Sequence, residues 1–290
     1  MTSANKPPAI DSHHHFWDPK RGDYPWMVGP VLPIRRVFTP DDMRPLLVPA
    51  GVQKTILVQT WSSYDESQEF LELAEATDFI AGVVAWVDLM ATDVDKQLDG
   101  LLAGPGGKWL VGIRHQVHDE ADPRWLCRPD VRRGLRAVQA RGLVYDLLIR
   151  PRVLAAALET VRALPDLRFV IDHIAKPEIA KDGFARWSEL IKPFGKAANV
   201  WCKLSGMVTE AVWATWTPEQ ITPYIDEVLN IFGPGRCMMG TDWPVSLLAS
   251  EYQRTVDLVR DAIAGLDETS QRAVLWTAAV EAYRLNEGRL

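Results

Sequence analysis

Short runs of apolar and β-branched residues recur along the chain, and each is followed by a stretch in which apolar residues repeat with helical spacing. This alternation is typical of βα units, in which helices join parallel strands and pack on the sheet. Eight runs have strand character: residues 9–15, 55–60, 80–89, 110–116, 143–149, 168–174, 199–205 and 237–242. The pattern therefore predicts a sheet of eight parallel strands.

Helix signals fall between and after these runs. Acidic residues open the stretch 65–77, where they complement a helix N-terminus, and Pro129 and Pro151 stand at first helical positions, where a missing N–H costs nothing. Gly142 lies where the stretch that starts at Pro129 would end. The predicted helices cover residues 65–77, 129–142, 151–164, 185–196, 218–232, 252–264 and 268–283. Eight strands and a closing helix predict a single (β/α)8 TIM barrel of the α/β class, with residues 1–290 as one domain.

Residues 16–42 interrupt the alternation after the first strand. This segment is rich in Pro, Gly and aromatic residues. Loops of such length in compact domains usually form lids or binding loops, or are disordered. Trp17, Tyr24 and Trp26 favour ordered packing, so we expect an ordered loop that can form a wall of a binding site.

Composition and charge narrow the classes of protein. The 290 residues are 47% hydrophobic and 24% charged, as in ordinary globular proteins, and the net charge of −6 is spread without long runs of one sign. This balance argues against nucleic-acid binding and gives no reason to expect an anionic membrane as partner. Cys127, Cys202 and Cys237 show no CxxC pairing and are expected to be reduced thiols. Neither a membrane span nor a signal peptide is evident, so we expect a cytoplasmic protein, and a homo-oligomer is left open.

Polar residues gather at the carboxyl ends of the predicted strands, where the active sites of (β/α)8 barrels lie. Strand side chains alternate, so Asp11, His13 and His15 share one face of the first strand. A HisXHis pair presents two nitrogens to a metal ion or to one substrate oxygen, and Asp11 can orient the imidazoles. The flanking IDS and FW argue against an expression tag as the origin of the histidines.

Other strands end in groups suited to catalysis or binding. The fourth ends in Arg114 and His115, the sixth in His173, and the eighth in Asp242, which is a natural general base. In the seventh strand, Lys203 lies in an apolar run, so its charge must either face solvent or find a partner. These strand ends predict a polar site at one mouth of the barrel.

The local sequences, taken as a set, resemble a known family. IDSHHHFWD, RHQVHDE, IDHIAKP, CKLSG and GTDWP are similar to the amidohydrolase superfamily over nearly the whole chain. The likeness is greatest to its sugar-lactone hydrolase branch of L-fuconolactonase- and L-rhamnono-lactonase-like enzymes, which is related to pyrone-dicarboxylate and sulfomuconolactone hydrolases. The resemblance implies hydrolysis of a cyclic ester, with His13, His15, His173 and Asp242 at the positions of the family's core motif.

This chain differs from the wider superfamily at two metal-ligand positions, and the difference changes the metal site that we expect. Metal-dependent members typically add a lysine after strand four and a histidine after strand five, whereas this chain offers other side chains there, Arg114 among them. The resemblance therefore argues against a dinuclear centre with a carboxylated lysine. It implies one divalent metal, expected to be Zn²⁺, held by His13, His15 and Asp242 with help from His173, and metal-independent catalysis stays open.

The roles implied by the resemblance start with Asp242, which takes a proton from the water that attacks the lactone carbonyl, while His173 stabilises the oxyanion. His13 and His15, or the metal that they bind, polarise the carbonyl oxygen. By position alone, six residues are expected to bind substrate hydroxyls or a carboxylate: Arg114, His115, Gln59, Tyr145, Asp146 and Lys203.

Two other functions stay open. The same barrel could decarboxylate an unsaturated acid with a bound metal, as another branch of the superfamily does, and CO2 release measured against acid release separates the two. A catalytically silent barrel would bind a metabolite or a partner without turnover. The four filled core positions argue against a silent barrel, and the twelve tryptophans are compatible with sugar stacking but more often serve packing.

Overall fold

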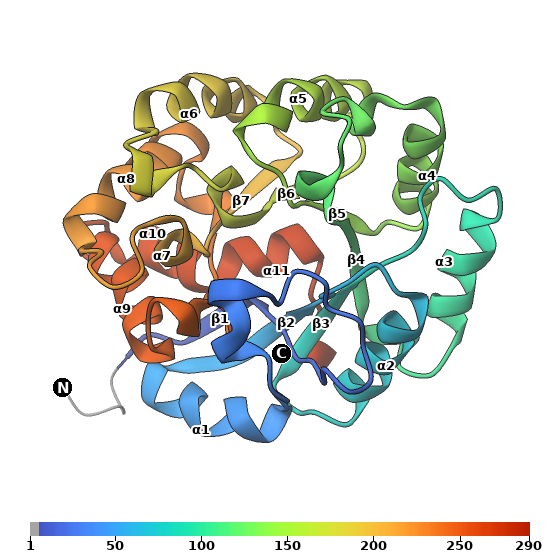
Figure 1. Ribbon diagram of the computed structural model, residues 1–290, viewed down its shortest axis with the longest axis horizontal. Coiled ribbons are helices and arrows are strands. Elements are labelled where there is room, and N and C mark those ends of the chain that lie inside the picture. The colour runs from blue at the N-terminus through green and yellow to red at the C-terminus, as the bar shows by residue number, and fades with distance from the viewer. Residues whose placement is uncertain (1–5) are drawn as a thin grey trace.

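Eight parallel strands lie at the centre of the computed structural model, which describes residues 6–290 (Figure 1). They are β1 (Ala9–His14), β2 (Val52–Val58), β3 (Ile80–Ala85), β4 (Leu110–His115), β5 (Val144–Leu147), β6 (Phe169–Ile171), β7 (Val200–Leu204) and β8 (Cys237–Met239). Each strand pairs with its neighbours in chain order. Residues 1–5, on which the expectation about a signal peptide partly rests, lie outside the described residues.

The ends of the sheet meet through the backbone that follows β8. The amide of His15 donates to the carbonyl of Trp243 over 2.7 Å, and the amide of Asp242 donates to the carbonyl of His13 over 2.8 Å. These hydrogen bonds join the carboxyl end of β1 to residues just beyond β8. The predicted (β/α)8 barrel is confirmed.

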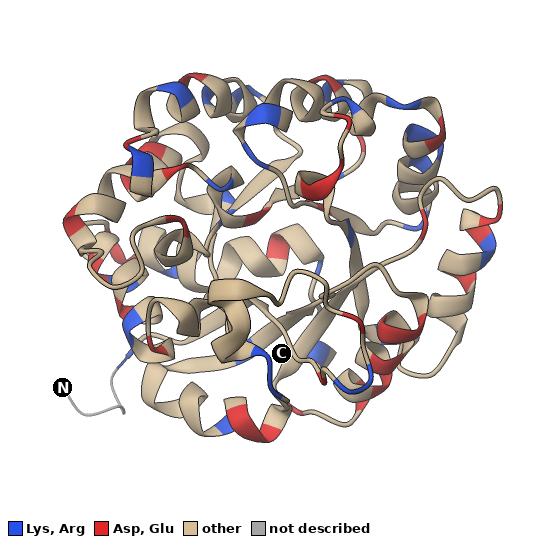
Figure 2. Ribbon diagram, viewed as in Figure 1, with Lys and Arg blue, Asp and Glu red and all other residues tan. Residues whose placement is uncertain are grey.

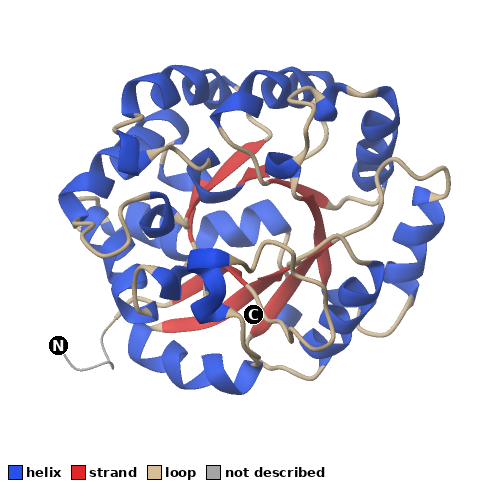
Figure 3. Ribbon diagram, in the orientation of Figure 1, coloured by secondary structure: helices blue, strands red, loops and turns tan. Residues whose placement is uncertain are grey.

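Helices form an outer ring around the strands (Figure 3). The ring and its connections contain α1 (Pro40–Ala50), α2 (Tyr64–Glu75), α3 (Val94–Ala103), α4 (Pro129–Ala140), α5 (Leu154–Ala163), α6 (Phe184–Ile191), α7 (Met207–Glu210), α8 (Pro218–Phe232), α9 (Tyr252–Ala262) and α10 (Glu268–Arg272). The last α-helix, α11 (Ala278–Tyr283), lies inside the ring (Figure 1). Each predicted helix overlaps one of these, and α10 and α11 are joined by a π-helical turn at Ala273–Thr277. The predicted loop ends earlier than expected, because Thr39 and Asp42 form a capping box that starts α1.

The strands are buried on both faces, as expected for a parallel sheet covered by helices. Alternate strand residues such as Ile56, Val84 and Val170 form a small apolar cluster with the last helix, α11, whereas their neighbours, such as Leu57, pack with the outer helices. Ala278, Ala279, Ala282 and Tyr283 are the α11 members of the small cluster. The last helix therefore packs against the interior of the barrel, and no described helix is long and apolar enough to span a bilayer.

The segment between β1 and α1 is ordered by its aromatic residues, as expected. Trp17 and Phe38 exchange backbone hydrogen bonds of 3.2 and 3.0 Å, and the indole N–H of Trp17 donates to the carbonyl of Ile34 over 3.1 Å. A 3-10 helix at Gly29–Ile34 lies within the segment. Lys and Arg are interspersed with Asp and Glu over the outer helices in the view of Figure 2.

Candidate active site and metal centre

The two β1 histidines have their ring orientation set from behind. Nδ1 of His15 lies 2.7 Å from the carbonyl oxygen of Val58, which can only accept, so Nδ1 carries the proton and Nε2 keeps a lone pair. Nδ1 of His13 lies 3.2 Å from both Oδ1 of Asp172 and Nζ of Lys203, an acceptor and a donor, so these two contacts do not fix its tautomer. Nε2 of His15 is free to bind a cation or to accept a proton, whereas Nη1 of Arg114 lies 3.2 Å from Nε2 of His13.

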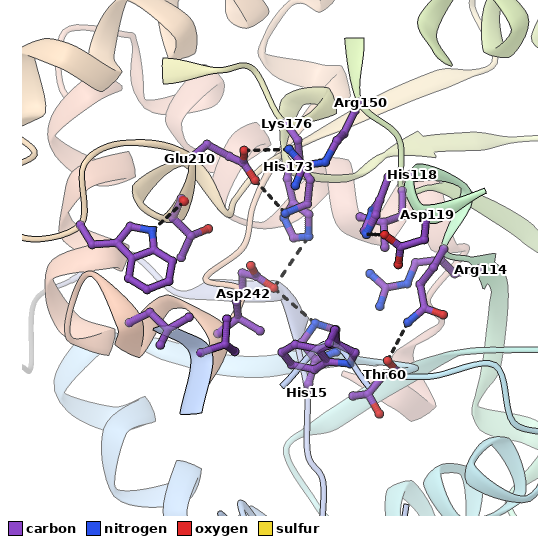
Figure 4. Close-up of a pocket in the computed structure, with 18 residues that line it drawn as sticks. His15, Thr60, Arg114, His118, Asp119, Arg150, His173, Lys176, Glu210 and Asp242 are labelled. Carbon is purple, nitrogen blue, oxygen red and sulfur yellow. Dashed lines mark hydrogen bonds and ion pairs between the residues drawn. The ribbon is translucent and has the colours of Figure 1, made fainter. Parts of the chain in front are cut away.

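The ring nitrogens of His13 and His15 converge on Asp242. The two Nε2 atoms of His13 and His15 lie 3.2 Å apart, and Oδ1 of Asp242 lies 3.3 Å from Nε2 of His15 and 3.8 Å from Nε2 of His13. Nε2 of His173 lies 3.7 Å from the same oxygen, and Figure 4 shows Asp242 between His15 and His173. The nitrogens of His13 and His15 therefore face the carboxylate of Asp242, with the ring of His173 on its other side.

Burial keeps the three imidazoles neutral. Desolvation lowers the pKa of His13 and of His173 well below the ordinary value, even though Asp172 acts on both in the opposite direction. Burial also lowers the pKa of His15, again against the effect of Asp242. Neutral imidazole is the form that ligates metals.

The distances fit a single metal ion. Zinc–nitrogen bonds of about 2.05 Å in a tetrahedral site place ligand atoms about 3.3 Å apart. Two of the three separations in the group His13, His15 and Asp242 are 3.2 and 3.3 Å, and the third is 3.8 Å. A second group, His13, Asp172 and His173, also has ligand atoms within 4.8 Å of one another. Since Asp172 is engaged by Arg114 and Lys203, the first group fits a metal better.

His173 is presented by an unusual stretch of backbone after β6. Residues 173–176 all have positive φ, between 48° and 62°, although none is glycine. The left-handed conformation costs L-residues roughly 1–2 kcal/mol each and is typical of functional sites. It turns His173 and Lys176 into the mouth of the barrel (Figure 4), and Oγ of Ser205 holds Nδ1 of His173 at 2.8 Å.

Gly206 leaves room for this ring, which gives a first prediction. At Gly206, φ is +63° and an added Cβ would lie 2.5 Å from Nδ1 of His173. We expect Gly206→Ala to displace the ring and to lower the free energy of unfolding by about 2–4 kcal/mol, through both overlap and φ strain. Thermal unfolding and the NMR signals of the His173 ring measure the two effects.

Gly29 is the control for that prediction. Its φ is +57°, close to that of Gly206, but an added Cβ would meet nothing within 4 Å, so Gly29→Ala carries strain from a positive φ without the overlap. If Gly206→Ala were no more destabilising than Gly29→Ala and left the ring signals in place, close packing against His173 would not explain this glycine.

Asp11 acts on the backbone rather than on the imidazoles. Its carboxylate accepts hydrogen bonds from the amide of His13 at 3.1 Å, from the amide and hydroxyl of Thr241 at 2.9 and 2.6 Å, and from the hydroxyl of Tyr252 at 3.1 Å. The expectation that Asp11 orients the rings is therefore corrected. Asp172 contacts the ring of His13 instead, and its signal in the sequence is a charged residue directly after the apolar strand β6.

A charged network fills the barrel interior beneath the histidines. Nζ of Lys203 lies 2.6 Å from Oδ2 of Asp146, 2.9 Å from Oδ1 of Asp172 and 3.2 Å from Nδ1 of His13. The hydroxyl of Tyr283, on α11, donates to Oδ2 of Asp146 over 2.8 Å. Lys203 thus has partners inside the protein and does not face solvent.

Arg114 joins this network to the mouth of the barrel. Its Nη1 lies 3.2 Å from Nε2 of His13 and donates to Oδ2 of Asp172 over 3.1 Å. Its Nη2 donates to the backbone carbonyl and, over 3.0 Å, to Oε1 of Gln59. Gln59 therefore holds Arg114 in place.

A cavity of about 350 Å³ opens above these groups. Asp242, His15, His173 and Arg114 line it, and Trp26 from the aromatic-rich loop forms part of its wall, as expected. Side chains that the sequence reasoning did not select complete the lining: Val31, Thr60, Gln116, His118, Asp119, Leu148, Arg150, Lys176, Thr209, Glu210, Trp213, Val245 and Leu248. Most of them lie in loops, where no periodic pattern marks which way a side chain points.

Of the six residues expected to bind substrate, only Arg114 lines this cavity. Tyr145 packs against Phe169 in the outer apolar cluster, and His115 stacks on Trp125 with Nε2 2.7 Å from Glu120. Gln59, Asp146 and Lys203 are completely buried in the network beneath the cavity. Their positions favour a structural role for these five residues, in place of the expected contact with substrate.

Comparison with known proteins gives consistent relatives. Residues 10–285 match the model of the family described as Amidohydrolase. The chain is 38% identical to the L-fucono-1,5-lactonase of Burkholderia ambifaria over 84% of this chain and 82% of that protein. It is 37% identical to the L-fucono-1,5-lactonase of Burkholderia multivorans over 96% of each. The crystal structure of a Burkholderia multivorans amidohydrolase with bound zinc is similar with a TM-score of 0.91 at 34% identity, covering 97% of this chain and 100% of that one.

Proposed function

The chain belongs to the amidohydrolase family, and from this premise we propose that it hydrolyses the cyclic ester of a sugar-derived lactone to the free acid. The observation that carries the proposal is the convergence of Nε2 of His13, His15 and His173 on Oδ1 of Asp242 at the floor of a cavity. Two of the relatives named above are L-fucono-1,5-lactonases, which favours hydrolysis over decarboxylation and over a silent barrel.

Asp242 is proposed as the general base. Its Oδ2 has no hydrogen-bond partner within residues 6–290, and the residue lines the cavity, so a water molecule there can give up a proton to the carboxylate. The water oxygen then bonds to the lactone carbonyl carbon. When the ring C–O bond breaks, the leaving alkoxide takes the proton back, and the products are one carboxylic acid and one new hydroxyl.

His173 and Arg114 are placed to stabilise the charge that develops on the carbonyl oxygen. Both line the cavity, and both are held by other groups: Nδ1 of His173 by Ser205, and Arg114 by Gln59 and Asp172. Donors held in advance in a poorly hydrated site contribute most to such stabilisation.

The proposed cofactor is one Zn²⁺ ion, held by His13, His15 and Asp242. The convergence and spacing of the three ligand atoms support this assignment, and a zinc-bound relative is consistent with it. When bound, the ion supplies Lewis-acid polarisation of the lactone carbonyl. A cytoplasmic location and a small-molecule lactone as the partner stay part of the proposal, and the oligomeric state is left open.

Acid release is the direct test of the proposed function. Purified protein is screened with a pH indicator against aldonolactones, such as L-fucono-, L-rhamnono- and L-galactono-lactone, with CO2 measured in parallel. Acid release from at least one lactone supports the proposal. CO2 release from an unsaturated acid without lactone opening would move the function to decarboxylation.

Metal removal gives a second prediction. At a zinc concentration about 100 times its dissociation constant, binding adds about 2.7 kcal/mol of stability. We therefore expect chelation to lower Tm by about 5–10 °C, with loss of lactone hydrolysis, and zinc to restore both. Thermal melts with and without chelator, beside the hydrolysis assay, measure this.

His15→Gln and His118→Gln separate the proposed ligands from other histidines. His15→Gln should abolish the zinc-dependent rise in Tm, whereas His118→Gln should keep it, because His118 pairs with Asp119 outside the ligand group. Full hydrolysis after complete chelation would contradict the proposed requirement for zinc. Asp242 and His173 would then act without a metal ion.

A further inference from the structure

Three charged residues from consecutive loops meet on one wall of the cavity. Arg150 follows β5, Lys176 ends the left-handed stretch after β6, and Glu210 ends α7 after β7. Nζ of Lys176 donates to Oε1 of Glu210 over 3.0 Å, and Nη1 of Arg150 donates to Oε2 over 3.2 Å. Figure 4 shows this cluster on the opposite side of His173 from Asp242. The mechanism proposed above assigns these residues no role.

The cluster is ionised, and most of its donors are unused. Burial alone would raise the pKa of Glu210, but Lys176 and Arg150 outweigh it and hold the pKa below the ordinary value. A lysine has three N–H donors and an arginine five. Within residues 6–290, the ammonium of Lys176 and the guanidinium of Arg150 each donate a single hydrogen bond, to Glu210. The remaining donors are available to a ligand in the cavity.

A second pair extends this wall. Nε2 of His118 lies 3.2 Å from Oδ1 of Asp119, and both residues line the cavity beside Arg150 and Lys176. We call the five residues the polar wall: His118, Asp119, Arg150, Lys176 and Glu210. Its two cations, Lys176 and Arg150, share Glu210, and Asp119 supplies the second negative charge, so the wall as a whole has no net charge. The remaining cavity cation, Arg114, is paired with Asp172. A carboxylate or sulfonate substituent therefore meets no excess positive charge at the wall.

Apolar side chains complete the cavity. Trp26 and Val31 come from the loop after β1, and Val245 and Leu248 from the 3-10 helix that follows Asp242. A ligand that fills the cavity thus meets hydrogen-bonding groups on one side and hydrocarbon on the other. Neutral polyhydroxylated rings have hydroxyls that suit charged donors and acceptors without a net charge to balance.

We propose that the polar wall, with Lys176, Glu210 and Arg150 at its centre, binds the ring hydroxyls of a neutral polyhydroxylated lactone and selects it over lactones that lack hydroxyls or carry an anionic group. This inference rests on the proposed lactonase function and adds the residues that determine its specificity. The side chains of Lys176 and Glu210 are only 13% and 12% exposed, and a substrate without hydroxyls is penalised because it leaves such groups without a partner.

The test compares two substrates and three variants. The substrates are L-fucono-lactone, which is polyhydroxylated, and δ-valerolactone, which has no hydroxyl. Lys176→Met and Glu210→Gln should each raise KM for the hydroxylated lactone about 10-fold to 100-fold, the value of a hydrogen bond to a charged group. Their effect on δ-valerolactone should be much smaller, because that substrate offers the wall nothing to bind. Lys181→Met is the control, since its exposed ion pair with Glu178 lies outside the cavity.

The substrate comparison separates recognition from loop stability. If the ion pairs served only to pin three loops together, both lactones would lose rate equally, which would overturn the inference. The wild-type protein provides an independent test that does not depend on whether a variant folds. Its kcat/KM should favour the hydroxylated lactone over δ-valerolactone by about 100-fold or more.

The remaining outcomes are distinguishable. A wild-type protein that opens δ-valerolactone as efficiently as L-fucono-lactone, or that prefers a carboxylated lactone, would overturn the inference and leave the lactonase function standing. A wild-type protein that opens no lactone at all would overturn the proposed function itself.

Discussion

Replacing Asp242 with asparagine is expected to lower the rate of lactone hydrolysis by about 100-fold to 10,000-fold, the usual contribution of a general base. The amide cannot take a proton from water, and it replaces one of the three oxygen and nitrogen atoms proposed to hold zinc. The fold should survive, because Asp242 has a φ of 59° and asparagine is among the residues that tolerate this region. Steady-state kinetics with a thermal melt measure both parts.

Asp182→Asn is the matched control for Asp242→Asn. Asp182 also has a positive φ, 54°, but its side chain is exposed and lies away from the cavity. The Asp182→Asn variant should therefore keep the wild-type rate of lactone hydrolysis and the wild-type Tm. Near-normal turnover by Asp242→Asn would remove Asp242 from the role of base.

Asp172→Asn is expected to cause the largest loss of stability. Its carboxylate faces Nη1 of Arg114 at 3.1 Å, Nζ of Lys203 at 2.9 Å and Nδ1 of His13 at 3.2 Å, all of them buried. Removing one partner from a buried ion pair leaves an uncompensated charge and costs about 3–5 kcal/mol. Tm should fall by about 10 °C, and the midpoint of urea unfolding should fall with it.

An aspartate in an exposed ion pair serves as the control, because it tests whether burial causes the loss of stability in Asp172→Asn. Asp99 pairs with Nε of Arg141 at 2.8 Å, but its side chain is 67% exposed. Exposed pairs contribute about 0–1 kcal/mol, so Asp99→Asn should change Tm little. Equal stability losses in the two variants would mean that the interior network does not depend on charge balance.

The barrel could be predicted from the sequence because the local pattern of apolar residues shows which segments form strands, and packing in the folded protein favours the same segments. The positions at which the strands end were less predictable. The run 168–174 was predicted as a strand, but β6 ends at Ile171, since His173 and the following residues adopt left-handed backbone. No local propensity favours that conformation for Ile174, and only the surrounding structure can maintain it.

The site was predictable where strand alternation applies. His13, His15 and Asp242 come together as expected, and so does Arg114. Arg114 and His115 could not both face the cavity, however, because adjacent strand residues point to opposite sides. The same rule separates Asp146 from Tyr145. The polar wall could not be predicted, since Arg150, Lys176 and Glu210 are far apart in sequence and meet only when their loops are in place.

Residues from near both ends of the sequence contribute to the site and to the charged network beneath it. His13 and His15, within the first fifteen residues, supply two of the converging atoms, and Tyr283, seven residues before the last, donates to Asp146 in the floor beneath them. During synthesis the histidines emerge from the ribosome first, but the interior charges gain their last partner only when α11 arrives. The network of buried charges beneath the histidines is therefore complete only after α11 has packed against the barrel interior.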